Sequence, residues 1–129
     1  MNMTNIQQVN ESAINAKEVV MKWMQAVERR DYQSLRGIVS DNISYVGALN
    51  SFDRAEPYLK YLEHLNLPKF DIKKEFADSN DVCLLYEMTY REPPVTTFVC
   101  GWFHVNDDEG KITSLRFVVD PRPLFQQKK

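Results

Sequence analysis

Three segments near the C-terminus decide the fold: VCLLYEMTY at 82–90, VTTFVCGWFHV at 95–105 and ITSLRFVV at 112–119. All three are rich in the β-branched and aromatic residues that are typical of strands. The run NDDEG at 106–110 separates the last two segments and has the composition of a hairpin loop that ends in glycine. The segments therefore predict a series of antiparallel strands at the end of the chain.

Helical periodicity dominates the sequence upstream of these strands. An apolar stripe at helical spacing predicts a helix over 12–30. Asp31 is a suitable N-cap for a short second helix, and Asp53 with Glu56 forms a capping-box pattern before a third. Between the second and third helices, the run at 43–47 predicts a short strand. Helices followed by strands indicate an α+β fold rather than a parallel α/β sheet. The stripe consists of Ala16, Val20, Trp23, Met24 and Val27.

The two longer strands, 82–90 and 95–105, are substantially apolar on both faces. An antiparallel sheet with one solvated face carries polar residues on that face, and these strands do not. We expect one face to cover the helices and the other to pack against a second copy of the chain, because large exposed apolar patches mark interfaces. A strongly coiled sheet that covers part of itself is the alternative. The expected homodimer interface consists of Tyr86, Met88, Phe98 and Trp102.

The composition is that of one globular domain. The chain has 129 residues, of which 43% are hydrophobic and 26% charged, and a net charge of −2, which excludes a strongly basic nucleic-acid binder. We expect a domain over 12–125, a flexible segment at 1–11 and a tail at 126–129. No apolar run approaches the ~20 residues of a membrane span, and the polar N-terminus lacks signal-peptide features, so we expect a cytoplasmic protein without a membrane partner.

Cysteine, histidine and glycine are sparse. Cys83 and Cys100 lack CxxC spacing and fall in opposite sets of the two predicted strands, which disfavours a disulfide between them. With only two histidines, His64 and His104, no metal site is expected. None of the four glycines has the spacing of a phosphate-binding loop, so no nucleotide cofactor is expected, and we predict no cofactor of any kind.

The C-terminal residues resemble the last hairpin of the nuclear transport factor 2-like superfamily, in particular its SnoaL-like proteins. The resemblance rests on GWFHV at 101–105, EGKI at 109–112 and DPRP at 120–123, and extends over 13–124. It implies an α+β cone in which three N-terminal helices pack on a curved, mixed and mostly antiparallel sheet. It also implies an apolar pocket open at one end and dimerisation through the outer face of the sheet.

The same resemblance allows two catalytic patterns to be checked. Limonene epoxide hydrolase-like members use an Asp-Arg-Asp arrangement, but the position three residues before Asp120 is Phe117 here, and the mid-sheet aspartate falls near Cys83. Ketosteroid isomerase-like members place an aspartate base on the first short strand, and 43–47 contains no carboxylate. Neither pattern is present, and the fold itself hosts many activities.

Glu87 and Tyr45 are the candidate catalytic residues. If Glu87 faces the helices together with Leu85, burial raises its pKa and makes it useful as a general acid or base. Tyr45 could donate a hydrogen bond into the same cavity. The alternatives are a solvated or arginine-paired glutamate at the rim of the cone and a core tyrosine. The expected ligand pocket consists of Tyr45, Phe52, Tyr58, Leu62, Leu85, Glu87, Val99, Phe103, Leu115 and Phe117.

Three functions follow from these expectations. The first is binding of a small, largely apolar ligand in the cone. The second is a cofactor-independent isomerase or cyclase that uses Glu87 and Tyr45, and the third is a non-catalytic protein-interaction scaffold. An open cavity favours ligand binding, whereas a cone filled with side chains favours the scaffold.

Overall fold

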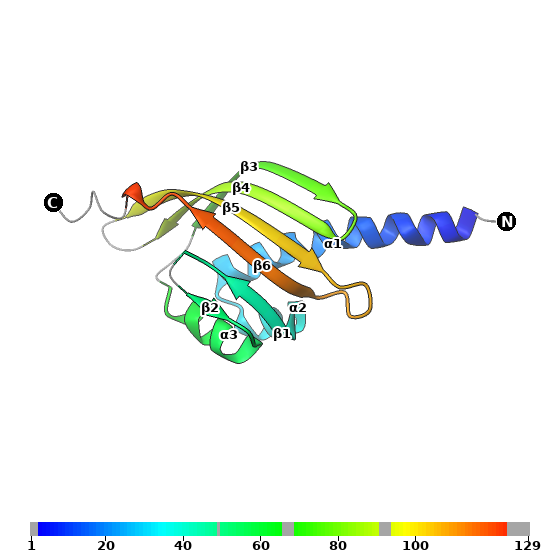
Figure 1. Cartoon of the computed structure of the whole chain (residues 1–129), viewed down its shortest axis with the longest axis horizontal. Coiled ribbons are helices and arrows are strands. Elements are labelled where there is room, and N and C mark those ends of the chain that lie inside the picture. The colour runs from blue at the N-terminus through cyan, green and yellow to red at the C-terminus, as the bar shows by residue number, and fades with distance from the viewer. Residues whose placement is uncertain (1–2, 49, 66–68, 91–93, 124–129) are drawn as a thin grey trace.

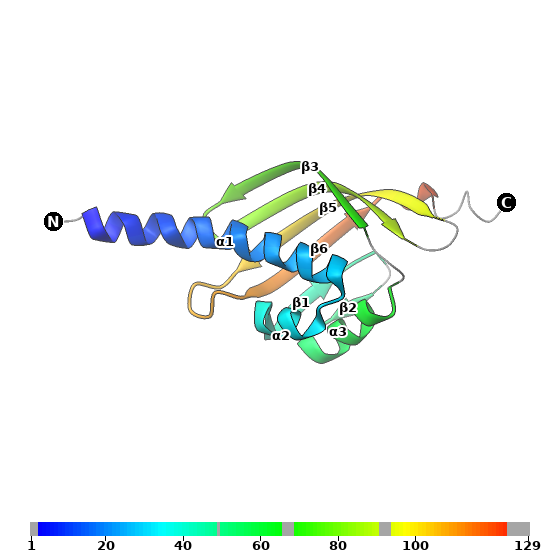
Figure 2. The ribbon, with the colours of Figure 1, turned by 180° about the vertical axis from the view of Figure 1, so that it is seen from behind.

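A six-stranded sheet curves around the first helix, and two shorter helices close one side (Figure 1, Figure 2). The computed structural model describes residues 3–48, 50–65, 69–90 and 94–123. The strand order is β2-β1-β6-β5-β4-β3, in which β1 pairs with β6 in parallel and all other pairs are antiparallel. The elements are α1 (Met3–Arg29), α2 (Tyr32–Ile38), β1 (Val39–Val46), β2 (Ser51–Phe52), α3 (Ala55–Glu63), β3 (Lys69–Asp78), β4 (Asp81–Tyr90), β5 (Val95–Val105) and β6 (Ile112–Val119). The predicted α+β cone, with three helices on a curved and mixed sheet, is confirmed.

The helix boundaries match the sequence patterns in part. Helix α1 begins at Met3 rather than at residue 12. The predicted cap of α2 is confirmed, because the Asp31 carboxylate accepts a hydrogen bond from the Ser34 backbone N–H at 3.1 Å. The capping box predicted for α3 is wrong, because the N-cap is Arg54 and no side chain caps the helix. The tail predicted at 126–129 lies outside the described residues.

A tight turn between β3 and β4 sets which residues of β4 face the helices. Ser79, at the turn, has a positive φ of 56°, and the adjacent Asn80 donates a side-chain hydrogen bond to the Val105 carbonyl at 2.8 Å. With the turn held this way, Val82 lies opposite Phe103 and Tyr86 opposite Val99. Directly opposite residues share a face, so these four residues all point toward the helices.

This register corrects the predicted faces of β4. Tyr86 is 1% exposed and belongs to the core, and Met88 packs against the core, so their prediction as interface residues is wrong. Leu85 and Glu87 alternate with them and therefore lie on the outer face. A shift of one residue moves every side chain of a strand to the other face. Both sets of β4 are apolar, so composition alone could not choose between them.

The same register brings the two cysteines onto one face. Cys83 lies opposite Trp102, and Cys100 lies opposite Leu85, so the cysteines are diagonal neighbours on the outer face of β4 and β5. Their Sγ atoms are 3.7 Å apart, and both thiols are free. The prediction that they occupy opposite faces is wrong for the same reason as the prediction for Glu87.

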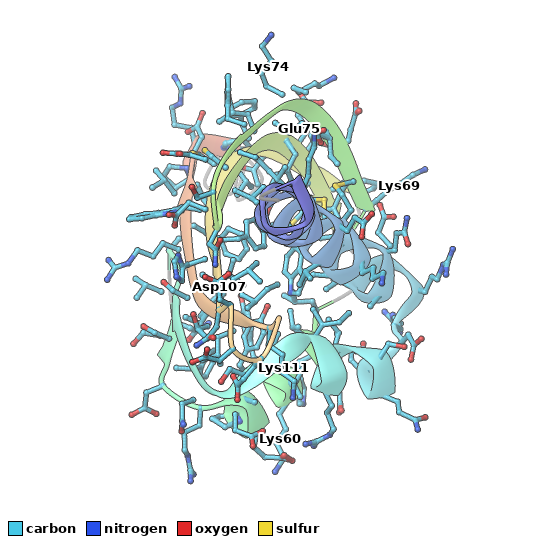
Figure 3. All side chains as sticks on the ribbon, turned by 90° about the vertical axis from the view of Figure 1, so that its right-hand side faces the viewer. Lys60, Lys69, Lys74, Glu75, Asp107 and Lys111 are labelled. Carbon is cyan, nitrogen blue, oxygen red and sulfur yellow. The ribbon has the colours of Figure 1, made fainter. Side chains whose placement is uncertain are left out.

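The core lies between α1, α3 and the concave face of the sheet. Seen along α1, the sheet curls around the helix and charged side chains project outward (Figure 3). An ion pair of 2.8 Å between Lys17 and Glu75 joins α1 to the edge strand β3, and the Glu28 carboxylate accepts a hydrogen bond from the Phe70 N–H at 2.8 Å. These contacts hold α1 across the sheet.

Candidate functional site

Aromatic side chains fill the narrow part of the cone. Trp23 of α1 lies edge-on to Phe103 of β5, with ring centroids 5.1 Å apart. Its indole N–H donates a hydrogen bond of 3.0 Å to the hydroxyl of Tyr58, which comes from α3. The three residues are 0 to 2% exposed. A ligand cannot enter this part of the cone without displacing the pair Trp23 and Tyr58.

A second group of aromatic residues lies where β1, β2, α3 and β6 meet. We call Tyr45, Phe52, Tyr61 and Phe117 the rim cluster. The Tyr45 ring lies 5.6 Å from both Phe52 and Phe117 and 6.0 Å from Tyr61, measured between centroids. Tyr45 is buried, whereas the other three residues are partly exposed and pack against the core. The rim cluster therefore joins the buried aromatic interior to solvent.

Gly47 leaves the space that the Tyr45 hydroxyl occupies. A Cβ atom at position 47 would come within 2.5 Å of that oxygen, so any larger residue would push the phenol aside. The backbone N–H of Gly47 donates to the Asn50 carbonyl at 2.8 Å, which closes the connection between β1 and β2. The local sequence thus fixes the position of one polar atom within an apolar cluster.

The tyrosines of this region are neutral hydrogen-bond donors. Burial raises the pKa of Tyr45 far above its usual value, with a smaller contribution from Tyr61, and burial likewise raises the pKa of Tyr58. A phenol with a raised pKa keeps its proton at physiological pH. The Tyr45 hydroxyl can orient a carbonyl or hydroxyl oxygen of a ligand, and it is not suited to remove a proton from one.

Most of the predicted pocket residues lie on the helix-facing side of the sheet or on the helices that cover it. The exceptions are Leu85 and Glu87. The Glu87 side chain is 45% exposed, and its carboxylate lies 3.8 Å from the Lys73 ammonium on the outer face. The expectation that Glu87 is buried among apolar residues is therefore wrong. The residues that face inward as predicted are Tyr45, Phe52, Tyr58, Leu62, Val99, Phe103, Leu115 and Phe117.

Other residues of the aromatic interior were not among the predicted pocket residues. Trp23 carries the one indole N–H of the interior, and Phe70 stacks on it with centroids 5.9 Å apart. Tyr61 follows Tyr58 by three residues and so lies on the same side of α3. That spacing, and the alternation of Phe70 with Ile72, were the signals in the sequence.

The one His–Asp pair among the described residues lies outside the cone. Asp81 Oδ1 is 3.0 Å from Nδ1 of His104 and accepts a hydrogen bond of 2.9 Å from the Trp102 indole. These contacts, that to His104 first, hold the pKa of Asp81 below its usual value. His104 lies on the outer face, as predicted. Across the described ranges, no group of three or more histidine, cysteine or acidic side chains could hold a metal ion.

Within the described part of the chain, no helix is both long enough and apolar enough to cross a membrane.

Comparison with known proteins gives one family and many solved structures. A family model described as a SnoaL-like domain matches residues 20–115. A nuclear transport factor 2-like protein of unknown function from Cytophaga hutchinsonii is 27% identical, with a TM-score of 0.77 over 85% of this chain and 94% of that one. None of the curated proteins matches the sequence.

Two further structures carry names of enzymes. An epoxide hydrolase from M. tuberculosis, similar to limonene epoxide hydrolase, is 21% identical, with a TM-score of 0.79 over 88% of this chain and 89% of that one. A putative SnoaL-like polyketide cyclase from Shewanella putrefaciens is 12% identical, with a TM-score of 0.78 over 88% and 84%. At these identities the likeness concerns the fold, and a shared fold does not select a reaction.

Proposed function

Since this chain is a member of the SnoaL-like domain family, we propose that it binds a small, largely apolar ligand against the rim cluster. The ligand carries an oxygen that accepts a hydrogen bond from the Tyr45 hydroxyl. The observation that carries the proposal is the partial exposure of Phe52, Tyr61 and Phe117 around this buried phenol. Ligand sites of this kind are mostly apolar with a few fixed polar groups.

The position of the ligand follows from the packing of the interior. Because Trp23, Tyr58 and Phe103 fill the narrow part of the cone, the ligand contacts the rim cluster without passing the hydrogen bond between Trp23 and Tyr58. Phe117 touches Trp23 with centroids 5.9 Å apart, so a ligand on Phe117 changes the surroundings of the indole. Trp23 is thus a natural reporter of binding.

The alternative function, an isomerase or cyclase, requires the Glu87 carboxylate to reach the same ligand as Tyr45. Glu87 lies on the outer face of β4, and Tyr45 lies on the inner face of β1, so the two side chains cannot act on one ligand. The rim cluster offers donors and apolar surface, and it contains no ionisable base. Binding at the rim, rather than proton transfer, is the function that this chemistry supports. The filled narrow part of the cone is the feature that favours the scaffold alternative.

A fluorescence titration tests the proposal. The chain has two tryptophans, so the variant Trp102→Phe leaves Trp23 as the only indole. We expect tert-butylcyclohexanone to change the Trp23 emission and to saturate. The matched hydrocarbon tert-butylcyclohexane, which lacks the carbonyl oxygen, is expected to bind about fivefold more weakly, as one hydrogen bond contributes about 1 kcal/mol.

The variant Tyr45→Phe in the same background should lower the affinity for the ketone to that for the hydrocarbon. The control Tyr32→Phe, which removes a phenol of α2, should leave both affinities unchanged. An emission that stays constant up to the solubility of the ketone would contradict the proposal. So would a Tyr45→Phe variant that distinguishes the two probes as well as the parent does.

A second proposal concerns the outer face of the sheet. Phe98, Trp102 and Val118 form an outer patch, and these residues are 43, 53 and 72% exposed. Val118 lies opposite Cys100, between Phe98 and Trp102, so the patch is continuous across β5 and β6. We infer that a second copy of the chain covers it in a homodimer, since monomers rarely expose contiguous apolar patches.

Sedimentation of the protein at micromolar concentration tests the homodimer. We expect a species of twice the 15.1 kDa chain mass. Trp102→Glu should shift it to the monomer, because burying an unpaired charge is costly. Gln33→Glu introduces the same charge on exposed α2 and should leave the dimer intact. A parent protein that sediments only as the monomer would refute the interface.

A further inference from the structure

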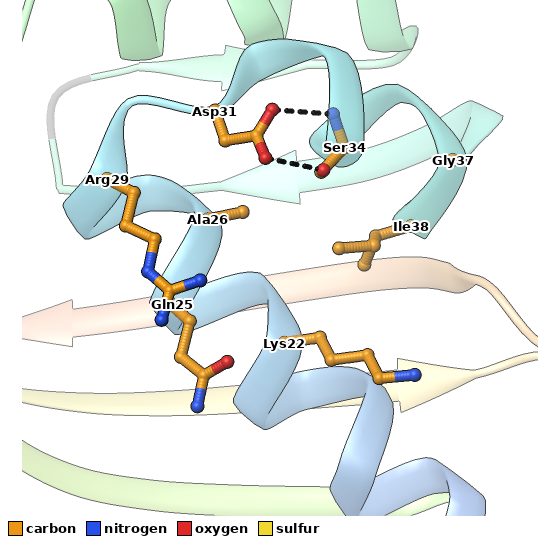
Figure 4. A pocket seen from close by; sticks show the side chains of 8 residues that line it. All are labelled: Lys22, Gln25, Ala26, Arg29, Asp31, Ser34, Gly37 and Ile38. Atoms are coloured by element: carbon orange, nitrogen blue, oxygen red, sulfur yellow. Dashed lines mark hydrogen bonds between the residues drawn. The ribbon is translucent and has the colours of Figure 1, made fainter.

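A groove lies between α1 and α2, away from the rim cluster (Figure 4). Its volume is about 390 Å³, toward the lower end of the range of small-molecule sites. One wall comes from α1, and the other comes from Asp31 and α2. The lining residues are Lys22, Gln25, Ala26, Arg29, Asp31, Ser34, Gly37 and Ile38.

The side of α1 that lines the groove carries mostly polar residues, whereas the side of a helix that packs against another helix is apolar. Lys22, Gln25, Ala26 and Arg29 are spaced i, i+3, i+4 and i+7, so they share one side of the helix. Helices that pack directly against each other place apolar residues at such positions. Here Ala26 alone is buried, and it forms the floor together with the half-buried Ile38. The stripe leaves a groove with apolar floor and charged edges.

The charges of the groove favour a monoanion. Lys22 and Arg29 make no ion pair among the described residues. The Asp31 carboxylate is engaged by Ser34, whose backbone N–H and hydroxyl donate to it at 3.1 and 2.6 Å. The two cations and the one carboxylate give the lining a net charge of +1. A single carboxylate on the ligand would balance that charge.

Gly37 supplies an independent observation. Glycine is among the least favourable residues within a helix, and α2 holds this one just before its last residue. Its φ is not positive, and a Cβ atom added to it would meet nothing within 4 Å. Neither a special backbone conformation nor tight packing within the protein therefore requires glycine here. The open space beside Gly37 leaves its backbone accessible to another molecule.

We propose that this groove binds a small amphipathic monocarboxylate. The carboxylate binds the Arg29 guanidinium, whose planar donor pair suits a carboxylate. Lys22, two turns earlier on α1, adds positive charge at the other end of the groove (Figure 4). The Gln25 amide donates a further hydrogen bond. The apolar part of the ligand lies on Ala26 and Ile38 and passes over Gly37.

Titration of the full chain, followed by the backbone amide resonances in NMR, tests the proposal. The probes are hexanoate, hexanol and hexylamine, which share one alkyl chain and differ in the charge of the head group. Hexanoate should shift the resonances of Gln25, Ala26 and Gly37 with one saturating curve. Hexanol and protonated hexylamine should bind at least fivefold more weakly at these residues. Equal shifts from all three probes, or hexanoate shifts confined to other residues, would overturn the proposal.

Variants separate a binding role from a structural one. Arg29→Gln and Lys22→Gln should each weaken hexanoate binding about fivefold or more. Arg36→Gln is the control, because Arg36 lies on α2 outside the groove and pairs with Glu56. Gly37→Ala should raise the melting temperature and also weaken hexanoate binding. A Gly37→Ala variant that is more stable and binds hexanoate as the parent does would overturn the role given to Gly37. Lys22→Gln and Arg29→Gln variants that both bind like Arg36→Gln would overturn the site.

Discussion

The two faces of the β4–β5 pair are similar in composition and opposite in surroundings. On the inner face, Leu84, Tyr86 and Phe103 are at most 1% exposed beneath α1 and α3. On the outer face, Phe98 and Trp102 are about half exposed, at 43 and 53%. The difference shows that the apolar content of a strand says little about which face is covered. For β4, the turn at Ser79 decides the question, because it fixes the register.

The sharpest test of this comparison exchanges one aromatic residue on each face for alanine. Phe103→Ala should lower the free energy of unfolding by about 3–5 kcal/mol, because it leaves a cavity in the buried interior. Trp102→Ala, at the next position along β5, should cost less than about 1 kcal/mol at a concentration where the protein is monomeric. Urea unfolding monitored by circular dichroism measures both values. Equal losses from the two variants would mean that the outer face is covered within the monomer.

A second test compares one hydrogen bond from each face. Tyr58→Phe removes the acceptor of the Trp23 indole and leaves a buried N–H unpaired, so we expect a loss of about 1–3 kcal/mol in the free energy of unfolding. On the outer face, the hydroxyls of Thr89 and Thr96 are 2.8 Å apart and exposed to water. Thr89→Val should cost less than about 0.5 kcal/mol, because water replaces the lost partner. If Thr89→Val lowered the free energy of unfolding and Tyr58→Phe left it unchanged, the expected difference between the two faces would be contradicted.

The smallest expected effect is a dependence of stability on pH at the outer face. The contacts with His104 and Trp102 hold the pKa of Asp81 below its usual value, so the folded state favours the carboxylate. This stabilisation is present above the unfolded-state pKa near 3.9 and is lost as the pH falls through the lower folded-state value. Because the Asp81 side chain is 42% exposed, solvent screening keeps the contribution below about 1 kcal/mol.

The comparison of wild type with Asp81→Asn checks this dependence. The difference between their free energies of unfolding, measured from pH 7 down to pH 2.5, should shrink at the acidic end. A constant difference across that range would show that ionisation of Asp81 does not stabilise the fold.

Sequence patterns predicted the helices and strands more accurately than they predicted which face of each strand points toward the helices. The apolar stripe of α1 and the cap at Asp31 are local patterns, and each is found in the structure. Which residue set of β4 faces the helices is not determined by a local pattern. Both sets are apolar, and the register of the strand depends on the turn at Ser79. The misplacement of Glu87 and of Cys83 has this one cause.

Part of the candidate site was predicted correctly from the alternation of side chains along the strands. Phe103 and Phe117 face inward as predicted, and so does Tyr45. The hydrogen bond between Trp23 and Tyr58 joins α1 to α3 across 35 residues, and a sequence pattern contains no information on such a contact. The groove between α1 and α2 was missed for a related reason, since it depends on how two helices meet.

The parallel pairing of β1 with β6 has a consequence for the synthesis of the chain. Strands β3 to β6 pair with their neighbours in the sequence and can form hairpins as they are made. Tyr45 of β1 lies opposite Leu115 of β6, so closing this pair requires a loop of about 70 residues. During synthesis on the ribosome, β1 therefore cannot pair with β6 until nearly the whole chain has emerged. We expect the pairing of β1 and β6 to form late in folding, with the N-terminal helices docking onto the sheet as it forms.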